Sequence, residues 1–141
     1  EFEKTPHFIL SFNRLNNDDE IIGYGYPNSA KTQVAQFDTF HFTGQWSRGK
    51  IIEFHPDGAY LVKNSCYSTT MHFDSGASGG PVAFNDCVIG VNSSSWNLIP
   101  GETPLSYVTP VEFISNLLFP ISKSQNVAVS NLIKHNVIQV K

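Results

Sequence analysis

The stretch Asp74-Ser75-Gly76-Ala77-Ser78-Gly79-Gly80-Pro81-Val82 decides how the rest of this chain is interpreted. Its central serine is flanked by glycines, and a proline and an apolar run follow. Glycine permits φ > 0 and lets other groups approach the backbone closely, so the stretch favours a tight turn. On such a turn the serine hydroxyl points outward and the neighbouring amides converge on one point, as in acyl-transfer enzymes that hold an oxyanion. A glycine-rich surface turn without function is the alternative.

Composition limits the classes of protein to which the chain can belong. Its 141 residues suit one domain, and a hydrophobic content of 40% supports a core. Charged residues make up 15%, and the net charge is −3 without a run of Lys or Arg. A nucleic-acid-binding surface would show a basic stripe, so we expect no nucleic-acid partner. No apolar segment reaches the roughly 18 residues of a membrane helix, so we expect no membrane partner.

Metal ligands and cysteines add little chemistry. No pair of His or Cys has the short spacing of a zinc site, and the acidic cluster 18–20 lacks the calcium-loop pattern. We therefore expect no metal site and no cofactor. The two cysteines, Cys66 and Cys87, are too few for a disulfide framework, and they form either one bridge or two buried free thiols.

Short strand patterns separated by turns dominate the chain, which indicates an all-β sandwich or barrel. The run 31–42 alternates in part and is predicted to be one strand with a bulge. His55-Pro56-Asp57-Gly58 is a strong turn signal, so strands 46–54 and 59–66 are expected to form a hairpin. Asn85-Asp86 predicts a second, tight hairpin. The other expected strands are 8–12, 20–26, 81–84, 87–92 and 106–109.

One helix is predicted after these strands. Thr109 is a suitable cap, Pro110 suits the first helical position, and Glu112 suits the first turn. Apolar residues then recur at helical spacing over 113–118, and Pro120 ends the pattern. The tail beyond Pro120 allows either a helix or a strand.

The run Gly76–Pro81 resembles the nucleophile motif of chymotrypsin-like (trypsin-fold) serine peptidases of the bacterial trypsin-like type. The family's order and spacing hold over roughly residues 5 to 119, through weaker similarities at 22–27, 44–52, 88–93 and 109–118. The resemblance implies a closed antiparallel Greek-key barrel, the second of the family's two, over residues 1–120. It also implies a short C-terminal helix, and it leaves a tail over residues 121–141.

The family's catalytic His and Asp lie in its first barrel, and neither motif is found here. The resemblance therefore implies an N-terminal peptidase barrel as partner, from the same precursor or a second chain. The chain is a fragment, one chain of a cleaved enzyme, or a natural remnant, and we favour a missing N-terminal portion. Alone, it is expected to be nearly inactive. Phe37, Phe40 and Phe42 are candidates for an apolar face where the first barrel docks and which would promote self-association.

By the same resemblance, Ser78 is the nucleophile, and the backbone amides of Gly76 and Ser78 form the oxyanion hole. Ala77 stands where many animal members carry an aspartate that pairs with a newly cut N-terminus, so we expect no such activation switch. His72 lies near the position that forms the base of the primary specificity pocket. There it would favour an acidic or polar side chain.

The wall of the substrate cleft is implied in the same way. Ser93, Ser94 and Ser95 would line it and offer backbone groups to an extended polypeptide substrate. The resemblance thus implies a serine endopeptidase that cleaves peptide bonds through an acyl-enzyme. The remaining histidines, which are expected to be structural or exposed, are His7, His41, His55 and His135.

Two other classes of function fit part of the pattern. The run Gly76–Gly80 also matches the G-x-S-x-G elbow of α/β-hydrolases, but that elbow leads from a strand into a helix. Here it is followed by an expected β-hairpin. A peptidase-like barrel kept only to bind peptide or protein is the second alternative, since the catalytic His and Asp are absent.

Overall fold

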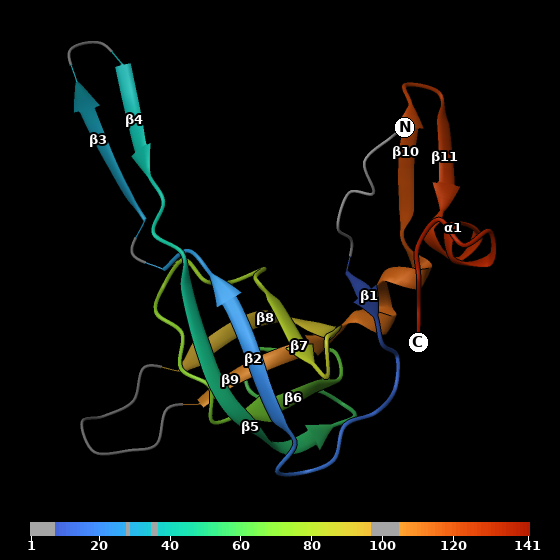
Figure 1. The fold of residues 1–141 in the computed structure, drawn as a ribbon, viewed down its shortest axis with the longest axis horizontal. Coiled ribbons are helices and arrows are strands. Elements are labelled where there is room, and N and C mark those ends of the chain that lie inside the picture. Colours follow the sequence, from blue (N-terminus) through green and yellow to red (C-terminus); the bar gives the residue numbers. More distant parts are fainter. Residues whose placement is uncertain (1–7, 28, 35–36, 97–104) are drawn as a thin grey trace.

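The computed structural model describes residues 8–27, 29–34, 37–96 and 105–141. Antiparallel strands close into a six-stranded barrel in the order β2–β5–β6–β9–β8–β7, and β7 pairs again with β2 (Figure 1). β6 pairs with β9 and not with β7, which follows it in the chain. The chain therefore crosses from β6 to β7 without forming a hairpin, as in a Greek key. The predicted all-β barrel is confirmed. Its strands are β2 (Glu20–Gly25), β5 (Gln45–His55), β6 (Cys66–Thr69), β7 (Pro81–Phe84), β8 (Cys87–Trp96) and β9 (Leu105–Pro110).

The barrel core comes from alternation along the strands. In β2 every second residue is buried, beginning with Ile21. Gly23 leaves the space that the Phe73 ring fills, because a Cβ on Gly23 would lie 2.6 Å from the Phe73 Cζ atom. The buried cluster consists of Leu15, Ile21, Ile51, Tyr67, Met71, Phe73, Ala77, Val82, Ile89 and Val108.

The run 31–42 is not one strand, which corrects the prediction. It belongs to a hairpin of β3 (Ala30–Val34) and β4 (Phe37–His41), paired from Ala30 opposite His41 to Val34 opposite Phe37. Both arms are rich in β-branched and aromatic residues, which favour strands, and residues 35–36 are Ala and Gln, so the sequence carries no turn signal there.

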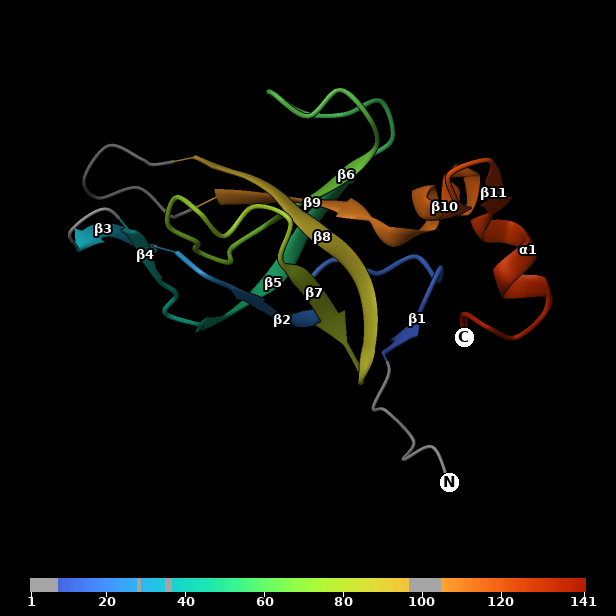
Figure 2. The ribbon, with the colours of Figure 1, turned by 90° about the horizontal axis from the view of Figure 1, so that it is seen from above.

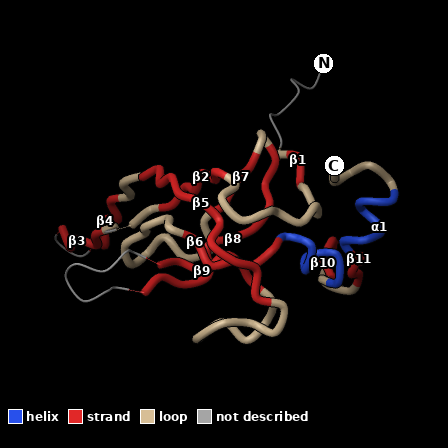
Figure 3. The backbone as a smooth tube through the Cα atoms, turned by 90° about the horizontal axis from the view of Figure 1, so that it is seen from below, coloured by secondary structure: helices blue, strands red, loops and turns tan. Residues whose placement is uncertain are grey.

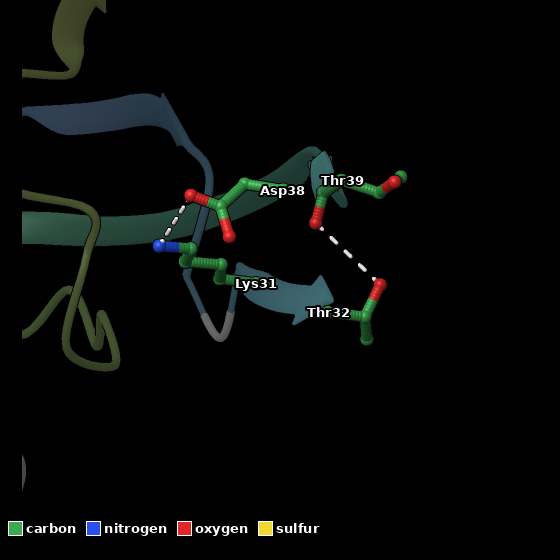
Figure 4. A network of polar contacts seen from close by, with 4 residues as sticks. All are labelled: Lys31, Thr32, Asp38 and Thr39. Atoms are coloured by element: carbon green, nitrogen blue, oxygen red, sulfur yellow. Dashed lines mark hydrogen bonds and ion pairs between the residues drawn. The ribbon is translucent and has the colours of Figure 1, made fainter. Parts of the chain in front are cut away.

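The β3–β4 hairpin extends away from the barrel (Figures 1 and 2). Polar contacts join its two arms, as Figure 4 shows. Lys31 Nζ lies 2.7 Å from Asp38 Oδ2, and the Thr32 hydroxyl donates to the Thr39 carbonyl at 3.5 Å.

β5 and β6 pair as a hairpin, but β6 begins at Cys66 and not at Ala59 as predicted. The expected turn is present, since Gly58 has φ +86° and a Cβ there would lie 2.3 Å from the Val62 carbonyl oxygen. Ala59 and Val62 exchange backbone hydrogen bonds of 2.9 and 3.0 Å. These bonds close a local turn over residues 59–62, so these residues do not pair with β5.

The predicted helix is shorter than expected and differs in type. It is a 3₁₀ helix, η1 (Val111–Asn116), with Pro110 at its N-cap and no side-chain cap. Thr109 does not cap it, because Thr109 lies in β9 and its hydroxyl is hydrogen-bonded to Ser93. Pro120 does not end it either, because the chain is already extended at Leu117.

The tail contains both structures that its sequence allows. β10 (Leu118–Ser122) and β11 (Gln125–Ala128) form a hairpin, and α1 (Val129–Lys134) follows. The expected domain boundary at residue 120 therefore falls inside β10. This end of the molecule lies opposite the β3–β4 hairpin (Figures 2 and 3). In the described part of the chain, no helix is long and apolar enough to cross a membrane.

The expected strand 8–12 is reduced to β1 (Ile9–Leu10). β1 runs parallel to the first residues of β8 and lies outside the closed barrel. On its other side Leu10 bridges Val140, so the end of the tail packs back beside the start of the described chain.

Both cysteines are buried and free, which decides between the two alternatives left open by the sequence. Burial raises the pKa of the Cys66 thiol, and a hydrogen bond with the Ala59 backbone partly opposes this shift. A buried thiol with a raised pKa supplies little of the reactive thiolate.

We expect both thiols to react slowly with Ellman's reagent in the native protein and rapidly after unfolding in guanidinium. The physical reason is the burial of both sulfur atoms. Absorbance at the released thiolate's wavelength measures the reaction. Rapid native labelling would contradict the burial, and failure of the unfolded protein to react would indicate a disulfide.

Candidate active site

Ser78 stands on a tight turn that leads into β7. The Gly80 amide donates to the Ala77 carbonyl at 3.1 Å. Gly76 and Gly79 have φ of +99° and +85°, a left-handed conformation that other residues rarely adopt. Ala77 is buried and Ser78 is exposed. The turn is therefore anchored by the alanine and presents the serine hydroxyl to solvent.

Asn92 of β8 holds this turn in place. Its carbonyl accepts from the Gly79 amide at 2.7 Å, and its amide donates to the Gly80 carbonyl at 2.9 Å. Its buried side-chain nitrogen, Nδ2, donates to the Ala77 carbonyl at 3.4 Å. Among the described residues, Asn92 Oδ1 has no partner. Sequence reasoning did not single out Asn92, although an amide side chain after the apolar run 87–91 was a usable signal.

The same turn leaves two backbone amides available. Within the described residues, no hydrogen bond takes the amide of Gly76 or of Ser78. Both residues border a hollow of about 310 Å³ lined by Tyr24–Tyr26 and Gly76–Pro81. The structure thus brings the residues expected to form the nucleophile and the oxyanion hole to one hollow.

β8 offers an open backbone edge beside this turn. β7 pairs with β8 only as far as Val91. Beyond it, Ser94 and Ser95 pair with β9 alone among the described strands. The Ser93 hydroxyl is occupied within the barrel wall by a 2.5 Å hydrogen bond with Thr109. An edge of this kind suits the addition of an extended peptide.

His72 does not reach the hollow at Ser78. Its side chain is 48% exposed, and its Nε2 atom lies 3.3 Å from Asp74 Oδ1. The residues lining the hollow do not include it. A specificity pocket that contains His72 stays a prediction.

Comparison with solved structures identifies the architecture. An HtrA-type protease AlgW variant with decapeptide matches with a TM-score of 0.60 and 14% identity, over 98% of this chain and 36% of that chain. AlgW with decapeptide matches with a TM-score of 0.55 and 13% identity, over 99% and 43%. The inactive form of Rv3671c from M. tuberculosis H37Rv matches with a TM-score of 0.51 and 17% identity, over 77% and 50%.

The chain has the trypsin-like barrel fold. It spans half or less of the length of these solved chains. No family profile and no curated protein matches the sequence.

The trypsin-like barrel excludes the α/β-hydrolase alternative. The glycine–serine turn leads into β7, which pairs antiparallel with β2 and β8. A hydrolase elbow would instead lead into a helix within a mainly parallel sheet.

The described part of the trypsin-like barrel supplies no base for Ser78. None of its histidine nitrogens forms a hydrogen bond with the Ser78 hydroxyl. His41 contacts the Thr32 hydroxyl at 3.2 Å, and His55 contacts the Ser68 hydroxyl at 2.9 Å. His135 is the C-cap of α1. His7, expected to be structural or exposed, lies outside the described residues.

The three phenylalanines expected at an apolar face are exposed. Phe37 and Phe40 lie on β4, and Phe42 follows it. Of the three, Phe40 and Phe42 stack on each other, with ring centroids 6.3 Å apart. Docking of a first barrel on them stays a prediction.

Proposed function

We propose that this chain is the serine-bearing barrel of a trypsin-like serine endopeptidase, with Ser78 as nucleophile. The observation that carries the proposal is the turn at Ser78. Ser78 is exposed, the backbone amides of Gly76 and Ser78 have no partner among the described residues, and both residues border the same hollow. The trypsin-like fold, and the decapeptide held by the AlgW structures, support a polypeptide substrate.

The proposed chemistry follows from this geometry. The Ser78 oxygen adds to the carbonyl carbon of a peptide bond while its proton passes to a histidine. The amides of Gly76 and Ser78 donate to the resulting oxyanion. The C–N bond then breaks, the amine leaves with the proton, and water hydrolyses the serine ester. A carboxylate holds the histidine, and we place both groups in an N-terminal barrel of the same precursor or of a second chain.

The full-length protein is expected to react with a fluorophosphonate probe at Ser78. Ser78→Ala should abolish labelling, while Ser124→Ala, which changes an exposed serine between β10 and β11, should leave it intact. Chain 1–141 alone should label at least about 10³-fold more slowly, because a serine without its base is a weak nucleophile. Gel fluorescence and peptide mass spectrometry measure the product. Labelling that survives Ser78→Ala would overturn the assignment.

A non-catalytic barrel that binds peptide or protein is the second candidate. The lack of a histidine at Ser78 among the described residues favours it. If the full-length protein fails to react under any condition while its fold remains intact, this candidate replaces the endopeptidase.

A further inference from the structure

Aromatic side chains gather next to the hollow at Ser78. We call Tyr24, Tyr26, Phe42 and Trp46 the aromatic flank. Their ring centroids form a chain, with 4.6 Å from Trp46 to Tyr24, 5.3 Å from Tyr24 to Tyr26 and 5.9 Å from Tyr26 to Phe42. Phe42 is 68% exposed and Trp46 is 65% exposed. The flank therefore combines rings that already support one another with a large accessible apolar surface.

The strand order places this flank across Ser78 from the open edge of β8. β7, which follows the Ser78 turn, lies between β8 and β2 in the barrel. On one side the Asn92 amide donates to the Gly80 carbonyl. On the other side Tyr24 is so near that a Cβ on Gly80 would lie 2.1 Å from the Tyr24 carbonyl oxygen. A polypeptide that runs along β8 and across Ser78 therefore reaches the aromatic flank.

Two adjoining hollows connect Ser78 to the flank. The first, at Ser78, includes Tyr24 and Tyr26 in its lining. The second, of about 540 Å³, is lined by Tyr26, Ser29, Phe42, Ser75 and Gly76. They share Tyr26 and Gly76. The volumes of both hollows lie in the range that is typical of ligand-binding clefts.

The flank carries no charge of its own. Among the residues that the structure describes, no charged side chain lines either hollow. The nearby Lys31 and Asp38 of the hairpin pair with each other at 2.7 Å. Burying a charged substrate residue here would leave that charge without an opposite charge. Apolar and aromatic residues would instead gain ring contacts and lose exposed surface.

We propose that the aromatic flank is a specificity subsite for an extended polypeptide bound across Ser78, and that it selects an apolar or aromatic residue. The proposal rests on the proposed function, since it takes the substrate to pass over Ser78. In this proposal Phe42 and the other side chains of the aromatic flank bind the substrate. A first barrel or a second copy of the chain as occupant is an outcome of the test.

Peptide binding to chain 1–141 tests the subsite without requiring catalysis. The probes are acetylated, amidated alanine pentapeptides whose central residue is Phe, Glu or Ala. Amide chemical shifts in ¹H–¹⁵N spectra locate binding and give Kd. We expect the Phe peptide to shift residues 24–26, 42 and 46 and to bind at least about tenfold more tightly than the Glu peptide.

Variants distinguish binding at this site from nonspecific binding of the peptide elsewhere on the surface. Phe42→Ala and Trp46→Ala should each weaken binding of the Phe peptide about tenfold. Leu61→Ala, which removes a 74% exposed side chain elsewhere, should leave Kd within twofold. Thermal unfolding confirms that each variant folds. Equal affinity for the Phe and Glu peptides, or Kd unchanged in both aromatic variants, overturns the subsite.

The other occupants give distinct results. Sedimentation that shows a dimer lost in Phe42→Ala would assign the flank to a second copy and overturn the proposal. Protection of residues 42 and 46 from peptide in the full-length protein, but not in chain 1–141, would assign it to the first barrel and overturn it equally. If peptide binding persists although the full-length protein does not react with the fluorophosphonate, the subsite is supported and only the catalytic role of Ser78 is overturned. If the full-length protein is labelled but Kd is unchanged in the aromatic variants, the catalytic role is supported and the subsite is overturned.

Discussion

Replacing Phe73 with alanine is expected to lower the free energy of unfolding by about 3–5 kcal/mol. Phe73 is only 1% exposed and belongs to the buried cluster of the barrel. Its ring also packs directly against Gly23 of β2. Removing it leaves a cavity between β2 and the loop before Ser78, in addition to the lost burial of the ring.

Urea denaturation followed by circular dichroism measures this change. The matched control is Phe8→Ala, because Phe8 is 72% exposed and its loss should change the free energy by less than about 0.5 kcal/mol. A loss below about 1 kcal/mol for Phe73→Ala would contradict the packing described here. A double-mutant cycle adds a sharper check: Gly23→Ala should cost less in Phe73→Leu than in the wild type, because the leucine lacks the ring atom that the new methyl group meets.

Gly80→Ala is expected to disrupt both the barrel and the Ser78 turn. The added Cβ would lie 2.1 Å from the Tyr24 carbonyl oxygen and 3.0 Å from the Ala77 carbonyl oxygen. Both are backbone atoms, so no side-chain rotation relieves the overlap. We expect a loss of about 2–3 kcal/mol in stability. Since small displacements of a nucleophile cost about 10²-fold in rate, fluorophosphonate labelling of the full-length protein should fall by that factor.

Gly79→Ala is the matched control in the same turn. A Cβ there meets nothing within 4 Å, so only the φ of +85° opposes it. The cost should be about 1–2 kcal/mol. If Gly79→Ala proved more destabilising than Gly80→Ala, the close approach of β2 to this turn would be wrong. Denaturation and labelling rates, measured on the same variants, give both quantities.

Local signals in the sequence were sufficient where the structure depends on neighbours in the chain. Three elements could be predicted: the Gly-rich turn at Ser78, the turn that contains Gly58, and the strand β2. Each depends on the types of adjacent residues, which favour a backbone conformation or alternate between apolar and polar. The hairpin of β3 and β4 was missed because a local signal is absent. Its residues 35–36 carry no turn signal, so two arms rich in strand-favouring residues look like one strand.

Capping at Thr109 was wrong because a tertiary partner overrode a local preference. Its hydroxyl is bound to Ser93 from β8, which the sequence places 16 residues away. Asn92 was overlooked because its role is visible only when the turn at Ser78 folds against β8. Neither contact has a signature in the neighbouring residues.

The sequence by itself determined that this is an all-β chain with an exposed serine on a glycine turn, since glycine positions and alternating apolar residues constrain the backbone locally. The tertiary structure alone decided what surrounds that serine. Closure of the barrel places β7 between β8 and β2 and thereby brings an open strand edge and an aromatic cluster to the turn that carries Ser78. Such proximity depends on which strands pair, and pairing between distant segments is fixed by the packing of the whole core.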